Sequence, residues 1–164
     1  MATASTHDYV SVLNGLIETC KDGEEGYRKA AENVKRSDLQ TLFNEYSHQR
    51  AQFASELQVE AARIGGDPAK GGSVAGALHR GWIDVKGAFT AKDDHNILEE
   101  AERGEDVAVK AYREALSKEL PSDFRSIVDK QYRQVQETHN KIRTLRDTTS
   151  DAGPTGTLET SRTF

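Results

Sequence analysis

Apolar residues recur every three or four positions over residues 8–35, which is the spacing of one buried stripe on an α-helix. The same spacing returns after Ser37 and Asp38 and ends at Gly65. The Ser37 and Asp38 side chains can cap the free amides at the start of a second helix. Because only a few residues separate the two stretches, they are expected to form a helical hairpin.

Two further helices are expected in the second half of the chain. The first starts at Asp93 or Asp94 and stops before Pro121, because the residue that precedes a proline disfavours the helical conformation. Ser122 can cap the last helix. The polar residues 147–164 have no apolar face to bury and are expected to be a disordered tail.

The two hairpins are joined by residues 65–96, a glycine-rich stretch that is too long for a tight turn. This stretch is expected to cross along the bundle and to contain a short helix that begins at Ser73 and packs Trp82 against the bundle. Two hairpins with one long crossover are typical of ferritin-like four-helix bundles. The predicted fold class is therefore all-α, with residues 1–146 as the bundle.

A short internal repeat supports this pairing of helices. The stretch from Ile17 through Gly23-Glu24 aligns with the stretch from Leu98 through Gly104-Glu105 at a constant offset. The repeat places Glu24 and Glu105 at equivalent positions, each within about 30° of the centre of its helix's apolar stripe. Both carboxylates are therefore expected to face the interior, where an unpaired charge costs several kcal/mol.

Three arrangements would satisfy two such carboxylates. In the first, Glu24, Glu105 and His139 bind a divalent metal such as iron, because carboxylate oxygens and imidazole nitrogens are suitable ligands. In the second, the glutamates accept hydrogen bonds or pair with a cation, which makes a purely structural polar layer. In the third, that end of the bundle is open to water. The side chains that would support a polar core are Gln49, Arg50, Gln131, Tyr27 and Tyr112.

The motif Glu45-x-x-His48 also has the spacing of two metal ligands on one helical turn. Its direction is unsuitable, however, because His48 lies about 165° from the centre of its helix's apolar stripe. His48 is therefore expected to face water.

The stretches LIETCKDGEEGYRKAAE, GALHRGWIDVKGAFTAKDD and AERGEDVAVKAYREAL resemble a bacterial ferritin-like four-helix-bundle family of unknown function. That family is distantly similar to the rubrerythrins and ferritins, and the resemblance covers nearly all of residues 5–147. The metal-handling relatives place one glutamate on each of the first and third helices, positions that Glu24 and Glu105 match. They place a Glu-x-x-His motif on each of the second and fourth helices.

In this chain the repeat alignment places Gln49-x-x-Gln52 and Gln131-x-x-Gln134 in those two motif positions. Neutral amides are poor iron ligands, so the resemblance implies that the scaffold has been kept and the oxygen chemistry lost. It also suggests a stress-associated role. The residues favour a bundle that is non-enzymatic and whose buried polar cluster either binds a metal weakly or is purely structural. The alternatives are a carboxylate-bridged metal oxidase or peroxidase and an oligomeric interaction module.

The composition and charge of the chain disfavour several further classes of function. The chain has 22 Lys and Arg against 27 Asp and Glu, and its net charge of -5 disfavours nucleic acid as a partner. A single cysteine, Cys20, cannot form an internal disulfide, and no apolar run is long enough to cross a bilayer. A cytoplasmic protein with no membrane partner is expected. No nucleophile–base pair or phosphate-binding loop is found, so no catalytic residue is predicted.

Overall fold

The computed structural model describes residues 6–64 and 93–149, and these residues form four long α-helices without a strand. In chain order the helices are α1 (Thr6–Asn33), α2 (Ser37–Arg63), α5 (Asp94–Leu116) and α6 (Ser122–Thr148). The predicted all-α four-helix bundle is confirmed.

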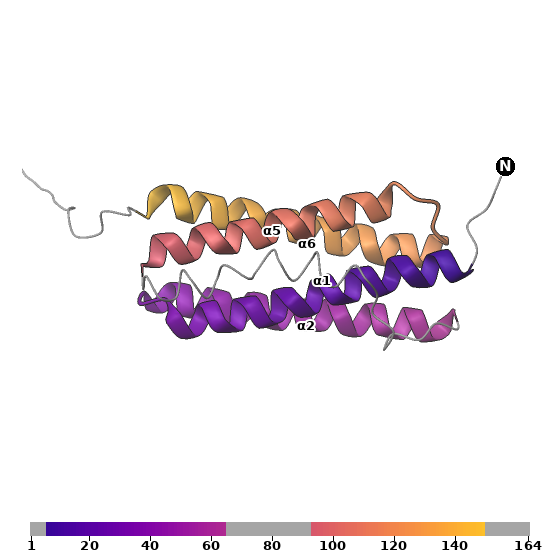
Figure 1. The fold of residues 1–164 in the computed structure, drawn as a ribbon, viewed down its shortest axis with the longest axis horizontal. Helices are drawn as coiled ribbons and strands as arrows, with labels where there is room; N and C mark the ends of the chain where they lie inside the picture. The colour runs from indigo at the N-terminus through magenta and orange to yellow at the C-terminus, as the bar shows by residue number, and fades with distance from the viewer. Residues whose placement is uncertain (1–5, 65–92, 150–164) are drawn as a thin grey trace, which may run out of the picture.

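The helices lie side by side as two hairpins, α1 with α2 and α5 with α6 (Figure 1). The α1 helix also packs along α5, whereas α2 and α6 approach each other more loosely. This looser contact leaves a groove between α2 and α6. None of the described helices is long and apolar enough to span a membrane.

The buried apolar side chains form two clusters at different levels of the bundle. One cluster includes Leu13, Leu57 and Phe124, and the other includes Phe43 and Ile97. Along α2 and α5 the two clusters are separated by charged side chains, which are themselves buried. The core is therefore divided by a polar layer.

The helix starts differ in part from the expected ones. Ser37 and Ser122 are the first residues of α2 and α6, and the positions before them, Arg36 and Pro121, make no side-chain cap hydrogen bond. The prediction that Ser37 or Ser122 caps its helix is wrong, because a capping residue must precede the helix in an extended conformation. Asp93 caps α5 as expected, since its carboxylate accepts the His95 backbone N–H at 2.9 Å.

Some expectations concern parts of the chain that lie outside the described residues. These are the crossover along residues 65–92, the short helix beginning at Ser73 with Trp82, and residues 150–164 of the expected tail. At its described end, α6 reaches Thr148, two residues beyond the expected bundle boundary.

Asp94 ties the two hairpins together at one end of the bundle. Its carboxylate accepts the backbone N–H groups of Lys35 and Arg36, in the turn between α1 and α2, at 2.8 and 3.1 Å. The same carboxylate lies in the first turn of α5, where the helix dipole favours a negative charge. The Asp94 side chain therefore links the start of α5 to the turn between α1 and α2, which is distant in sequence.

We expect Asp94→Ala to lower the free energy of unfolding by about 1–3 kcal/mol, because two backbone donors lose a charged acceptor. Urea unfolding followed by circular dichroism would measure the change. Asp129→Ala is the control, since it removes only an exposed ion pair with Arg133 and should cost less than about 1 kcal/mol. Equal losses in both variants would contradict the role of Asp94.

Candidate functional site

The polar layer is built around an ion pair between Arg50 on α2 and Glu105 on α5. The Arg50 Nη2 atom lies 2.9 Å from each carboxylate oxygen of Glu105, and the two side chains are only 2% and 0% exposed. The Tyr27 hydroxyl, on α1, donates a hydrogen bond of 2.5 Å to Glu105 Oε2. Three helices therefore meet at one buried carboxylate.

The remainder of the Arg50 side chain is also accommodated. Its Nε donates to Gln49 Oε1 at 3.3 Å, and its guanidinium carbon lies 5.6 Å from the centre of the Tyr27 ring. Gly23 on α1 leaves room for it, because a Cβ atom there would lie 3.3 Å from Arg50 Cγ and 3.3 Å from Nη1. A glycine is normally unfavourable in a helix interior, and here it avoids a tight contact with the Arg50 side chain.

The protonation states follow from this environment. Burial and the adjacent Glu105 carboxylate both raise the pKa of Tyr27 well above its usual value. Burial lowers the pKa of Arg50, but the Glu105 carboxylate and Tyr27 raise it by more, so the net shift is upward. Arg50 therefore stays charged and Tyr27 stays a hydrogen-bond donor at neutral pH.

A second buried network connects α1, α5, α6 and α2. The Tyr112 hydroxyl donates to Gln131 Oε1 at 2.7 Å, and Gln131 Nε2 donates to Glu56 Oε1 at 2.8 Å and to the Phe53 carbonyl oxygen at 3.3 Å. Because the single hydroxyl proton of Tyr112 is given to Gln131, the Cys20 thiol, 3.1 Å away, is the donor in its contact with Tyr112. The network runs from a buried thiol to the groove between α2 and α6.

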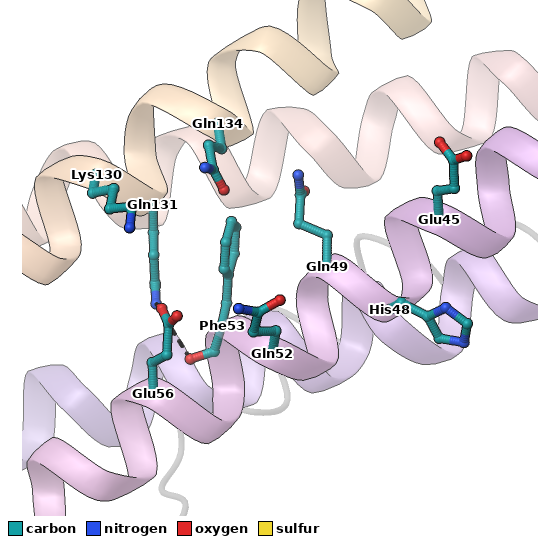
Figure 2. A pocket seen from close by; sticks show the side chains of 9 residues that line it. All are labelled: Glu45, His48, Gln49, Gln52, Phe53, Glu56, Lys130, Gln131 and Gln134. Atoms are coloured by element: carbon teal, nitrogen blue, oxygen red, sulfur yellow. Dashed lines mark hydrogen bonds between the residues drawn. The ribbon is translucent and has the colours of Figure 1, made fainter.

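That groove has a volume of about 410 Å³ and is lined by both glutamine motifs. Figure 2 shows Gln49 and Gln52 on α2 facing Gln131 and Gln134 on α6, with the Phe53 ring between them. The predicted direction of His48 is confirmed, because its side chain is exposed to solvent where it borders the groove. The glutamine side chains of the two repeat-related motifs therefore line the same groove.

The structure divides the expected metal ligands between two places. Glu105 is buried as expected, but its carboxylate is held by Arg50 and Tyr27. Glu24 is only partly buried, and among the described residues its carboxylate makes no hydrogen bond or ion pair. His139 is partly buried on α6, and its Nε2 lies 2.6 Å from Oδ1 of Asp106 on α5. The three residues do not come together.

The difference at Glu24 has a geometric cause. On α1, Leu16, Thr19 and Ala30 are buried in addition to the expected stripe. With these positions included, Glu24 lies about 50° from the centre of the buried face instead of within about 30° of it. At the equivalent position on α5, Glu105 stays in the interior.

The side chains expected to support a polar core are divided between the two networks. Tyr27, Arg50 and Gln49 belong to the Glu105 network, and Tyr112 and Gln131 belong to the Cys20 network. The spacing of stripes on single helices indicates which residues turn inward. It does not indicate which of them meet, because that depends on how far each helix is shifted along its neighbour.

The central network lies in the part of the chain that matches a known protein family. Residues 8–118, which include α2, α5 and most of α1, match the family model described as "Domain of unknown function (DUF2383)". The chain belongs to the DUF2383 family. No curated protein matches this DUF2383 chain. The matched residues include the whole Arg50–Glu105–Tyr27 network. The α6 helix, which supplies one side of the groove, lies beyond them.

We expect Glu105→Gln to lower the free energy of unfolding by about 3–5 kcal/mol, because it leaves Arg50 as an uncompensated buried charge. Adding Arg50→Met should recover part of this loss, since it removes the orphaned charge and keeps a long side chain. Denaturant unfolding of both single variants and the double variant would measure the coupling. Strictly additive losses would contradict a direct pair. Glu25→Gln, at an exposed ion pair with Arg28, is the matched control.

Cys20 should react slowly with thiol reagents in the folded protein. Burial raises the pKa of its thiol to about 11, so the reactive thiolate is scarce at neutral pH. Alkylation by iodoacetamide should be much slower in the native chain than in guanidinium, and its rate should show no plateau near pH 9. Rapid native labelling with a plateau in that range would contradict the buried position.

Proposed function

We propose that this DUF2383 protein is a non-enzymatic, ferritin-like bundle in which an internal guanidinium takes the place of a central metal. The observation that carries the proposal is the contact of Arg50 Nη2 with both oxygens of Glu105, at 2.9 Å each, in a site closed to water. The sequence resemblance to bacterial ferritin-like proteins supports a stress-associated role in the cytoplasm.

The residues at the centre do not fit a di-iron group. Such a centre needs four carboxylates and two histidines, whereas the motif positions on α2 and α6 hold Gln49, Gln52, Gln131 and Gln134. The Glu105 carboxylate already has a positive partner and a hydroxyl donor. A divalent cation about 4 Å from the guanidinium would be repelled by several kcal/mol even at the effective dielectric constant of a protein.

The same contacts support a structural role for the layer. A buried carboxylate whose two oxygens lie close to one guanidinium nitrogen, and which also accepts a hydroxyl hydrogen bond, has its charge compensated without an ion from solution. Along α2 and α5, Arg50 and Glu105 lie between the buried residues of the two apolar clusters. The second of the three arrangements considered above, the polar layer, is therefore the one that we propose.

We expect protein purified without chelator to accelerate the aerobic oxidation of Fe²⁺ no more than a Glu24→Gln/Glu105→Gln variant does. The reason is that Arg50 and Tyr27 occupy the oxygens that iron would need. Oxygen consumption and iron content by elemental analysis would be measured together. Stoichiometric iron and rapid oxidation in the wild type, both lost in the variant, would overturn the proposal in favour of a metal oxidase.

A further inference from the structure

Three side chains that can bind metals lie together on the outer side of α5 and α6. Glu102 and Asp106 are four residues apart on α5, so they project from the same face one turn apart. His139 faces them from α6. One ligand atom of each residue lies within 4.8 Å of the other two. No other group of three such residues is found in the described part of the chain.

The position of the group suits an exchangeable ion. The side chains of Glu102 and His139 are 12% and 17% exposed, whereas that of Asp106 is 62% exposed. Two ligands are therefore held against the helices, and the third opens to water, through which an ion can enter. The cluster stands on two long helices whose spacing is fixed by buried neighbours such as Ala101 and Ile142.

The charges are balanced by cations that a metal could replace. Arg146 makes a close ion pair with Glu102, and His139 makes one with Asp106 when its ring is protonated. Arg146 also contacts Asp147 at 2.8 Å, so it keeps a partner if it leaves Glu102. Two carboxylates and a neutral imidazole carry a charge of minus two, which matches one divalent ion.

We propose that Glu102, Asp106 and His139 form a binding site for a single zinc-class divalent cation, with water as the fourth ligand. Ligands around zinc lie about 2.0–2.2 Å from the ion, which places their atoms about 3–3.6 Å apart. In the structure the three ligand atoms lie within 4.8 Å of one another, so a bound ion would require the side chains to rotate towards it. The imidazole favours zinc, cobalt or nickel over magnesium and calcium, which prefer oxygen ligands alone.

This site is separate from the central layer and goes beyond the function proposed above. Asp106 follows Glu105 directly in the sequence, but it faces outward where Glu105 faces inward. Metal binding therefore leaves the Arg50–Glu105 pair in place. The two proposals can fail independently, because each depends on different side chains.

Titration of the full chain with Co²⁺, with any purification tag removed, would test the site. We expect one equivalent to bind and to give the visible absorption of a four-coordinate cobalt ion. Competition with Zn²⁺ should abolish that absorption. His139→Ala and the nearly isosteric Asp106→Asn should each weaken binding at least tenfold, with circular dichroism as the check that both variants fold. His48→Ala is the matched control, because it removes an exposed histidine on α2 far from the cluster in sequence.

A further variant gives a result that a nonspecific surface site would not produce. Arg146→Gln removes the cation that competes for Glu102, so it should bind Co²⁺ more tightly than the wild type. Loss of the cobalt spectrum in Glu105→Gln, with no effect in His139→Ala, would move the metal to the centre and overturn both proposals. No binding by the wild type, or equal weakening in His48→Ala and His139→Ala, would overturn this inference alone.

Discussion

A carboxylate without access to water needs a positive partner, and Glu105 has one in Arg50. Much of the molecule is arranged around this requirement. Gly23 leaves space for the arginine side chain, and Tyr27 supplies a donor to the second oxygen. The apolar clusters on either side exclude water and so make the pairing obligatory.

The two hairpins are related by a repeat, yet their interiors differ. Glu24 and Glu105 occupy equivalent positions, but α1 buries an additional face and turns Glu24 towards its edge. On the partner helices, the alignment that matches the two glutamine motifs sets Arg50 against Tyr132, which is only partly buried. The centre therefore has one charged pair where a symmetric bundle would have two, and the nearby link between α5 and α6 is a hydrogen bond between the neutral groups of Tyr112 and Gln131.

Helix number, helix pairing and most buried positions could be predicted from the sequence, because a three-to-four spacing of apolar residues determines which side of each helix avoids water. The inward direction of Glu105 and the outward direction of His48 follow from the same reasoning. The partners of Glu105 could not be selected, since Arg50, Gln49 and Gln131 all lie near the stripes of their helices. The group of Glu102, Asp106 and His139 could not be predicted, because its members lie at the edges of the apolar stripes of two helices. Which edges lie opposite each other depends on how the helices pack. His139 was expected to be a metal ligand, although together with Glu24 and Glu105, and the four-residue spacing of Glu102 and Asp106 was the signal for its neighbours on α5.

The ion pair joins α2 to α5, and these helices belong to different hairpins. Apolar side chains alone would tolerate a slide of one hairpin along the other, since many small and medium-sized residues can exchange neighbours. A slide of one helical turn, about 5.4 Å, would move the guanidinium away from the carboxylate and place both charges against hydrocarbon. The pair therefore fixes the axial register of the bundle, and misaligned assemblies of the same four helices are penalised by a stranded charge.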